Sequence, residues 1–487
     1  MFKKATSTVK WDGQLGETFE NICGVLQGGV SSPQLFKVFL EDLVKYLDTS
    51  YGIKINEKMI CHLLLADDLA LISESRYGLQ QLLNGFQNFC KQWHLVVNMD
   101  KTKFSIFNEN LVRSPDTTPI LYNKEKVKQT SDYVYVGINF STDKARFASH
   151  LENVADSANK AIFAAMSLAK NAIGGEMSAL TYLHIFDTQI RPILEYGSVI
   201  WFKNTFLEVL EKVQTKYFKR ALGVGDSTPH LALYGDTGKF PLLIRQRYAF
   251  LKFWVRLTQM PEGSILRDIY EEHVLLNTPY MAKVRSALEA TGIIPDELPI
   301  VNQENTNFFL RIVRNNNEFI YKSMWYNEIN DSEKNPMLRL YKQFKTEFKP
   351  ESYIKSISNR RLQKCLSRFR LSSHCLRIHK GRQERDKFGR NTPADRRFRL
   401  SCKSGQIDDE LHFLFKCSTH NNERENMLSK IQEYLNINQI RSIPEIELLN
   451  TILNSTDESV LYELSKFLSI AFRTRHLEYL NSANEDK

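Results

Sequence analysis

Residues 59–73 read MICHLLLADDLALIS, in which two short apolar segments meet at Asp67 and Asp68. This pattern predicts two strands joined by a tight acidic turn. Adjacent carboxylates repel one another and are costly in an apolar core. A divalent cation relieves both costs, because Mg²⁺ prefers hard oxygen ligands completed by phosphate. The alternative is an acidic hairpin tip in water, and the pair by itself does not decide between the two.

The flanking segments predict a mixture of strands and helices. Residues 6–21 predict a hairpin around Asp12-Gly13, because both residues of such a turn must tolerate positive φ. The glycine-rich loop GVLQGGVS leads into a helix that begins at Ser32, with Pro33 at its first position. The remaining elements expected before residue 141 are a helix over about 78–94 and short strands near 103–107 and 133–140. This pattern is typical of an α+β domain.

The rest of the chain predicts helices, a connection and a basic region. Residues 143 to about 260 are mostly helical in pattern, and a Pro-containing stretch near 278–307 predicts a connection with little regular structure. Between Lys342 and Lys403 there are 19 Lys and Arg against 5 Asp and Glu, a local charge of +14. Aromatic residues are interleaved with these cations, which suits nucleic acid, a polyanion that can also stack. The alternative is a solvated basic surface whose aromatic residues lie in a core.

Length and composition exclude several classes of protein. The chain has 487 residues, of which 42% are hydrophobic and 25% charged, and a net charge of +9. This is enough apolar material for about two to four folded domains, and it excludes disorder as the main state. No segment reaches the ~18 uncharged apolar residues of a membrane span. Seven cysteines are too few for a disulfide-stapled scaffold, and the first residues have no apolar signal segment.

Four motifs occur in an order that resembles a known family. They are GVLQGGVSSPQLFKVFLEDL (24–43), LLLADDLALIS (63–73), FCKQWHLVVNMDKTKFSIF (89–107) and YVYVGINFS (133–141). Together they are similar to motifs B, C, D and E in the palm of reverse transcriptases of the non-LTR retrotransposon class. Further along, IRPILEYGSVIWF (190–202) is similar to a segment of the thumb and downstream helical region of that family, and IDDELHFLFKC (407–417) to its C-terminal cysteine–histidine segment.

The resemblance implies an α+β fold, in which a partial right-hand polymerase palm precedes a mostly α-helical thumb and C-terminal region. The implied divisions are a palm (1–141), a helical thumb or connection (142–277), a linker and helical connection (278–340), a basic nucleic-acid-binding stretch (341–401), and a degenerate cysteine–histidine segment with C-terminal helices (402–487). The implied reaction is RNA-templated DNA synthesis, in which a primer 3′ hydroxyl attacks a deoxynucleotide α-phosphate with the help of two Mg²⁺ ions. The implied partners are an RNA template and a DNA primer, and no membrane.

The resemblance also implies roles for individual residues. Asp67 would bind metal, and Asp68 would complete the acidic pair. The loop and helix start would pack against the template base and the incoming nucleotide, through Gln27, Gly28, Ser32 and Pro33. Lys101 falls where the family has a lysine near the nucleotide phosphates. Gly137 falls in the turn that grips the primer end.

One departure from the family pattern bears directly on activity. Motif A supplies another aspartate from a strand well upstream of motif B, whereas only 26 residues precede Gln27 here. Motif A and the fingers are therefore expected to be missing, and the Asp12 hairpin turn is no substitute. We expect this chain to be inactive alone, because loss of a ligand or its support costs about 10–100-fold even in milder cases. The alternative function is a non-catalytic RNA- or DNA-binding protein that uses the basic C-terminal half.

The C-terminal cysteine–histidine cluster is incomplete. Cys402, His412 and Cys417 match the last three ligands of the family's Cys-x2-Cys, His, Cys pattern, whereas Arg399 occupies the first position. A structural zinc site has four ligands, and His420 offers one further ligand. Zn²⁺ binding and a packed remnant without metal both remain open. The sequence carries no convincing import or export signal, so the cellular location is not predicted.

Overall fold

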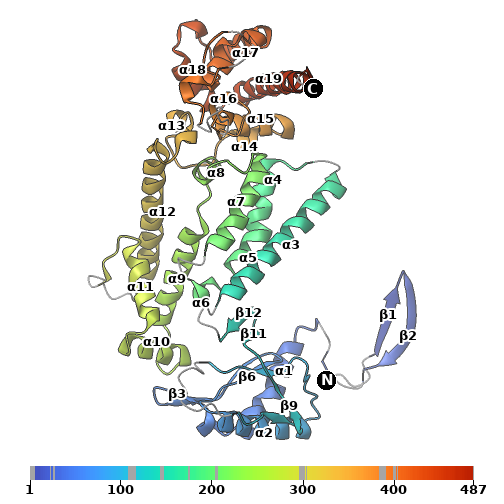
Figure 1. The fold of residues 1–487 in the computed structure, drawn as a ribbon. Helices are drawn as coiled ribbons and strands as arrows, with labels where there is room; N and C mark the ends of the chain where they lie inside the picture. The colour runs from blue at the N-terminus through green and yellow to red at the C-terminus, as the bar shows by residue number, and fades with distance from the viewer. Residues whose placement is uncertain are drawn as a thin grey trace. The chain divides into compact units, whose positions relative to one another are not determined.

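The computed structural model describes residues 6–21, 24–25, 28–107, 117–142, 147–173, 176–202, 207–295, 302, 304–382, 391–398, 402 and 404–485. Gln27 and Arg399, two positions singled out above, lie outside the described residues. The chain divides into two compact units, whose elements are drawn in Figure 1. Unit 1 is Met1–His150 with Met260–Thr278, and unit 2 is Leu151–Gln259 with Pro279–Lys487. The five functional divisions expected from the sequence stay predictions.

The strands of unit 1 pair two by two among the described residues. The hairpin of β1 (Thr6–Trp11) and β2 (Gln14–Glu20) turns at Asp12 and Gly13, which both have positive φ as predicted. The other antiparallel pairs are β3 (Ile53–Ile55) with β4 (Lys58–Ile60), β5 (His62–Leu65) with β6 (Asp68–Leu71), β8 (Leu121–Tyr122) with β9 (Glu125–Lys126), and β11 (Asp132–Tyr135) with β12 (Ile138–Ser141). Strands β7 (Lys103–Phe104) and β10 (Lys128–Gln129) pair in parallel.

Two helices supply the core of unit 1. Helix α1 (Ser32–Glu41) begins where the sequence predicts, with proline in its first turn, and continues as a 3₁₀ helix over Asp42–Tyr46. Helix α2 (Arg76–Gln92) begins after Ser75, whose hydroxyl accepts a hydrogen bond from the N–H of Gly78. Their apolar sides meet in one cluster with β6, built from Leu40, Leu43, Cys61, Leu82 and Phe89 with Leu69 and Leu71 against it. Unit 1 is therefore α+β, as expected.

A segment from far along the chain completes unit 1. Helix α10 (Ile265–Leu275) contacts β3. The ammonium Nζ of Lys58 lies 2.7 Å from Oδ2 of Asp268, and Asp268 is largely buried. Its backbone oxygen also accepts a hydrogen bond from the side chain of Asn56. These contacts join residues more than 200 positions apart, so the sequence pattern alone did not predict them.

Among the described residues of unit 2 the regular elements are helices, apart from one isolated bridge between Phe398 and Ile407. Its helices are α3 (Ala148–Ile173, beginning in unit 1), α4 (Ala179–Ile185), α5 (Arg191–Glu195), α6 (Ser198–Trp201), α7 (Glu208–Leu222), α8 (His230–Thr237), α9 (Leu242–Thr258), α11 (Pro279–Glu289), α12 (Thr306–Asn330), α13 (Tyr341–Phe344), α14 (Tyr353–Ser356), α15 (Arg360–Arg370), α16 (Arg377–Lys380), α17 (Asn421–Tyr434), α18 (Glu445–Leu453) and α19 (Glu458–Glu485). Helices α9, α11 and α12 lie side by side (Figure 1). The prediction of little regular structure near 278–307 is wrong for the part that forms α11.

Buried charges hold several helices of unit 2 together. The guanidinium of Arg370 in α15 is fully buried and lies 3.0 Å from Asp236 of α8 and 2.7 Å from Glu351. The hydroxyls of Tyr341 and Tyr353 donate to the same Asp236 carboxylate, each at 3.1 Å. Breaking such a network leaves a buried charge without a partner, which typically costs ~3–5 kcal/mol.

The aromatic residues of the basic stretch mostly lie in this core. Four of them are buried: Tyr341, Phe344, Tyr353 and Phe369. They are therefore not available to stack on bases, and the alternative of a basic surface over an aromatic core holds for these four. Among the helices that the structure describes, none combines the length and the apolar character needed to cross a membrane.

Candidate functional site

The acidic pair lies at the tip of the β5–β6 hairpin. The register pairs Leu65 with Asp68, so Ala66 and Asp67 form the two-residue turn. Both carboxylates are exposed to solvent. Ala66 has φ 52°, in the left-handed region that costs an L residue ~1–2 kcal/mol. The prediction that two apolar strands meet at this pair is confirmed, and the fold presents the pair at the surface.

A second hairpin lies close to the acidic pair. Strands β11 and β12 join through Val136 and Gly137, which both have positive φ. Burial and the negative charge of Asp68 together raise the pKa of the Tyr135 phenol. The charge of Asp68 thus acts on Tyr135, at the end of β11. Gly137 thus lies in a turn, as expected from the sequence, on the hairpin that neighbours the carboxylates.

The glycine-rich loop and Lys101 are near the surface of unit 1. Gly28 has φ 82°, and the backbone oxygen of Gly29 accepts a hydrogen bond from the N–H of Ser32 at 3.1 Å. Ser32 is buried and Pro33 is exposed. Lys101 is exposed, and its backbone N–H donates to the side chain of Asn98. Within the described part of the chain, no hydrogen bond or ion pair joins Gly28, Pro33 or Lys101 to the acidic pair.

The acidic pair fits a divalent cation in ligand type and falls short in ligand number. Carboxylate oxygens are the ligands that Mg²⁺ prefers. In the described ranges, however, Asp67 and Asp68 do not belong to any group of three or more His, Cys, Asp or Glu ligand atoms within 4.8 Å of one another. Further ligands would have to come from substrate phosphates, water or another part of the protein.

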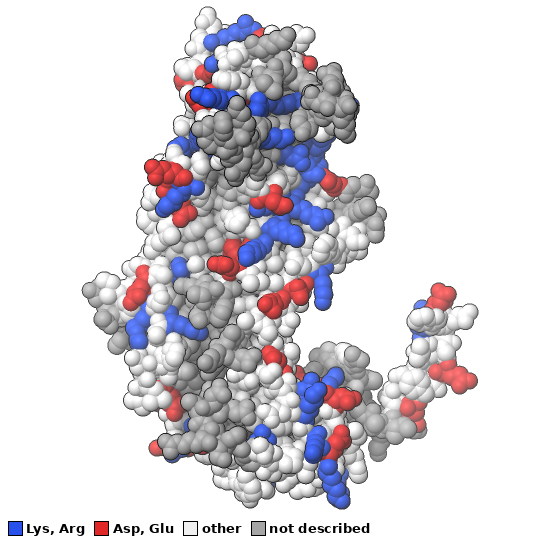
Figure 2. All heavy atoms as spheres, viewed as in Figure 1, with Lys and Arg blue, Asp and Glu red and all other residues white. Residues whose placement is uncertain are grey.

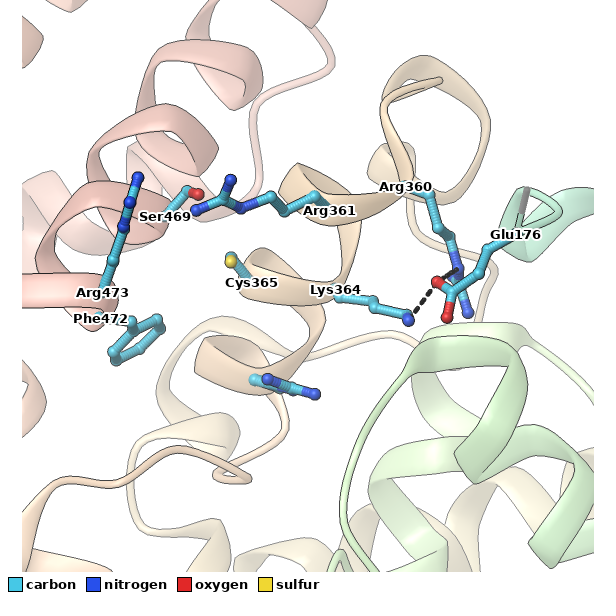
Figure 3. Close-up of a pocket in the computed structure, with 9 residues that line it drawn as sticks. Glu176, Arg360, Arg361, Lys364, Cys365, Ser469, Phe472 and Arg473 are labelled. Carbon is cyan, nitrogen blue, oxygen red and sulfur yellow. Dashed lines mark hydrogen bonds and ion pairs between the residues drawn. The ribbon is translucent and has the colours of Figure 1, made fainter. Parts of the chain in front are cut away.

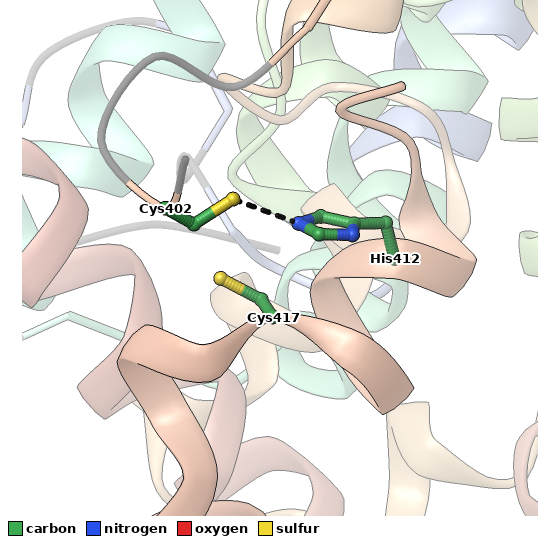
Figure 4. A group of neighbouring side chains, drawn as sticks. All are labelled: Cys402, His412 and Cys417. Atoms are coloured by element: carbon green, nitrogen blue, oxygen red, sulfur yellow. Dashed lines mark hydrogen bonds between the residues drawn. The ribbon is translucent and has the colours of Figure 1, made fainter. Parts of the chain in front are cut away.

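Three of the predicted zinc ligands come together in unit 2 (Figure 4). The ligand atoms of Cys402, His412 and Cys417 all lie within 4.8 Å of one another, and Sγ of Cys402 is 3.3 Å from Nε2 of His412. The π-helical turn His412–Lys416 brings His412 and Cys417 to the same side. The Nδ1 of His412 is 2.9 Å from the amide oxygen of Gln406. This contact leaves Nε2 facing the thiols, the orientation typical of a metal-ligating histidine.

The cysteine–histidine group has the right chemistry for Zn²⁺. Two thiols and one imidazole form a common zinc donor set. Burial opposes ionisation of Cys402, but hydrogen bonds from Ser404 and His412 hold the pKa of its thiol below the ordinary value. His420 is buried and does not belong to the group. His420 therefore does not supply the fourth ligand, although the sequence suggested it as a candidate.

A second cluster of potential ligands was not anticipated. His374, His379 and Glu410 are all buried, and Nε2 of each histidine lies close to the same Glu410 oxygen, at 3.3 and 3.0 Å. The other Glu410 oxygen pairs with Arg339 at 2.5 Å. Burial alone would raise the pKa of Glu410, but the two histidines and Arg339 hold it well below its ordinary range.

The arginine argues against a cation in this second cluster. Glu410 already has Arg339 as its counter-charge, and a divalent ion beside that guanidinium would be repelled. We therefore interpret the cluster as a buried group of charged and polar side chains around Glu410, in which Nε2 of His379 is hydrogen bonded to the carboxylate. Two histidines five residues apart and an acidic segment at 408–410 are the only sequence signals that could have pointed to it.

Comparisons with known proteins give one family. Residues 2–140 match the family described as "Reverse transcriptase (RNA-dependent DNA polymerase)". The chain is 24% identical over 229 residues to "RNA-directed DNA polymerase from mobile element jockey" of Drosophila melanogaster, over 45% of this chain and 24% of that protein. From the same organism, it is 29% identical over 145 residues to "Retrovirus-related Pol polyprotein from type-2 retrotransposable element R2DM", over 28% of this chain and 13% of that protein.

A third relative adds a slightly higher identity. The chain is 30% identical over 186 residues to "Probable RNA-directed DNA polymerase from transposon BS" of Drosophila melanogaster, over 37% of this chain and 20% of that protein. In each of the three cases the chain spans less than a quarter of the length of the relative.

Proposed function

Because residues 2–140 belong to the reverse transcriptase family, in its non-LTR retrotransposon type, we propose that Asp67 and Asp68 are two of the metal-binding carboxylates of RNA-templated DNA synthesis. The observation that carries the proposal is their position at the exposed tip of the β5–β6 hairpin, with Tyr135 of the neighbouring hairpin inside the field of Asp68. A nucleotide triphosphate has to reach its metal ligands from solvent, and an exposed turn allows that approach.

The other predicted residues have roles that agree with this chemistry. Divalent cations, when bound, would activate the primer hydroxyl and stabilise the leaving pyrophosphate. Gly28, with positive φ and no side chain, lets the backbone come close to the nucleotide. Lys101 supplies a positive charge for the phosphates, and the Gly137 turn supports the primer end. The proposed partners are an RNA template, a DNA primer and deoxynucleotides.

We further propose that the 487-residue chain assayed alone does not polymerise. The reason is the ligand count among the described residues, where no third protein ligand lies near both Asp67 and Asp68. The test is primer extension on an RNA template with this chain, with and without Mg²⁺. We expect no extension. Extension that requires Mg²⁺ and disappears in Asp67→Asn would contradict the proposed inactivity while supporting the role of the acidic pair.

Metal binding by the acidic pair can be measured without catalysis. We expect the chain to bind Mn²⁺, detected by the electron paramagnetic resonance signal of the free ion, more weakly after Asp67→Asn with Asp68→Asn. The matched control is Asp100→Asn with Glu125→Gln, which removes two exposed carboxylates elsewhere in unit 1. Equal loss in both double variants would show that Mn²⁺ binding does not depend on the hairpin tip.

A second candidate function is non-catalytic binding of RNA or DNA through the basic C-terminal half. It is favoured by the Lys and Arg side chains that gather over the region of α15 in Figure 2. Since four aromatic residues of the basic stretch are buried and cannot stack on bases, we expect most of the affinity to be electrostatic. We expect the logarithm of the binding constant to fall linearly with the logarithm of salt concentration. Binding that is insensitive to salt would contradict this function.

A further inference from the structure

Helix α15 borders an open groove in unit 2, drawn in Figure 3. The groove has a volume of about 470 Å³, within the range of ~300–1,000 Å³ that is typical of ligand sites. Its charged lining residues are five cations, Arg360, Arg361, Lys364, Arg368 and Arg473, and one acid, Glu176. This composition is strongly one-sided, so the groove has a positive potential that favours anions.

The sequence of α15 explains why its cations share one face. The helix reads RRLQKCLSRFR, and Leu362, Leu366 and Phe369 are buried against the rest of unit 2. The cations Arg361, Lys364 and Arg368 follow the spacing i, i+3 and i+7, which places them on the opposite face. Arg473 reaches the groove from α19, the helix that packs against α15 (Figure 3).

The cations differ in how many of their N–H donors already bind other groups of the protein. Glu176 pairs with Lys364 and lies 3.8 Å from Nε of Arg360. Arg360 also donates to the side chain of Gln363 and to the backbone oxygen of Arg220, each at 3.0 Å. Arg360 and Lys364 are therefore held in place by the protein. Their charges still add to the potential, but their donors are largely used.

The remaining arginines have donors to spare. Arg368 uses its Nε to donate to the backbone oxygen of Gly223 at 2.8 Å. Arg361 and Arg473 are exposed, and their side chains have no hydrogen-bond or ion-pair partner among the described residues. A guanidinium with free donors matches phosphate oxygens with two parallel hydrogen bonds.

We propose that this groove binds the phosphodiester backbone of a nucleic acid strand, with Arg361 and Arg473 as the principal phosphate contacts and Arg368 as a further one. The inference rests on the proposed nucleic-acid function and names its site in unit 2. The groove is open to solvent, so the backbone of a strand can reach its arginines. Contacts to phosphate carry no base information, so binding here is independent of sequence.

The test uses the full chain and a fluorescent 20-nucleotide single-stranded RNA of mixed sequence, with the same sequence as DNA. The variant is Arg361→Gln with Arg473→Gln, and the control is Lys252→Gln with Arg256→Gln, two exposed cations of α9. We expect the groove variant to bind either strand roughly tenfold more weakly at moderate salt. Its salt slope should fall by about 1.4, from two phosphates at ~0.7 each. The control should change binding less than about twofold.

Each other outcome has a definite meaning. Equal weakening in both double variants overturns the groove as the site, while nucleic-acid binding by the chain stands. No binding of RNA or DNA by the unmodified chain overturns the nucleic-acid function and this inference together. Displacement of the RNA by polyglutamate at an equal charge concentration overturns the assignment to nucleic acid and favours an acidic polypeptide. Arg361→Lys with Arg473→Lys, which keeps both charges, should retain the salt slope.

Discussion

At the scale of single residues, Ala66 connects the local backbone to the candidate active site. Its left-handed conformation is strained for an L residue. The pairing of Leu65 with Asp68 nevertheless confines the turn to two residues, of which Ala66 is the first. Strain of this kind persists only where the surrounding structure enforces it, and it is common at functional sites. Here the strained residue directly precedes the two carboxylates, so the strain helps to fix how they are presented.

Ala66→Gly should therefore stabilise the protein. Glycine adopts the left-handed region without strain but loses more entropy on folding, so we expect a net gain of roughly 0.5–1 kcal/mol in the free energy of unfolding. Urea denaturation followed by circular dichroism measures it. The control is Ala70→Gly in β6, at an ordinary strand position, which should destabilise. A loss of stability with Ala66→Gly would contradict the strain assigned to Ala66.

At the scale of elements, the close approach of α2 to the 3₁₀ helix Asp42–Tyr46 depends on Gly85. A Cβ at this position would meet the backbone oxygen of Tyr46, which cannot move aside as a side chain can. The two elements also share the core cluster that supports β6 and hence the acidic hairpin. Helix packing and presentation of the carboxylates are thus linked through one residue without a side chain.

Gly85→Ala should destabilise unit 1, although alanine is the better helix former. The helix preference favours alanine by about 1 kcal/mol, and overpacking in a filled core costs ~1–3 kcal/mol. Since the clash is with backbone, we expect a net loss. Thermal unfolding measures it, with Asn88→Ala on the exposed side of α2 as the control. A stabilised Gly85→Ala protein would contradict the close packing of the two elements.

The cysteine–histidine group gives a second prediction at this scale. We propose that Cys402, His412 and Cys417 hold Zn²⁺, since their ligand atoms lie within 4.8 Å of one another and form a common donor set. Metal analysis of the purified chain should find close to one zinc per molecule. Cys417→Ser should remove it, whereas Cys365→Ser in α15 should not. Zinc near zero in the unmodified chain would leave a packed remnant as the correct interpretation.

At the scale of the whole molecule, buried ionisable groups predict how stability depends on pH. Burial lowers the pKa of five histidines below the ordinary value of 6.5: His62, His150, His230, His273 and His379. The unfolded chain therefore binds more protons just below pH 6.5, and stability falls as the solution is acidified. Burial of Glu211 acts in the opposite sense. It raises the pKa of that carboxyl to about 7 from 4.5, so its contribution is lost as pH rises through 7.

The two effects can be separated by one substitution. We expect the melting temperature of the chain to fall between pH 7 and pH 5, because five histidines oppose one carboxyl. Glu211→Gln removes the opposing group, so it should make this fall steeper. Glu208→Gln, an exposed acid on the same helix, is the control and should leave the slope unchanged. A shallower fall with Glu211→Gln would contradict the raised pKa of Glu211.

The sequence by itself determined several local elements and the resemblance to a family. The hairpin turn at Asp12 and Gly13, the start of α1 at Ser32 and the two strands around Asp67 and Asp68 all follow from the φ range of glycine and aspartate, helix-start residues and apolar spacing. These constraints act over a few residues, which is why a pattern can reveal them. The motif order similarly identified the reverse transcriptase resemblance without any coordinates.

Only the tertiary structure decided which side chains of the basic region are buried and paired and which are exposed. The charge of Arg370 is paired with that of Asp236, which is 134 positions away in the chain. Arg361 lies nine positions before Arg370, on the other face of α15, and remains exposed. In the sequence, both residues are arginines of the same basic stretch, and nothing local distinguishes them. Burial and charge pairing are set by partners that the fold brings together from distant segments, and no local spacing specifies which partner a given arginine will meet.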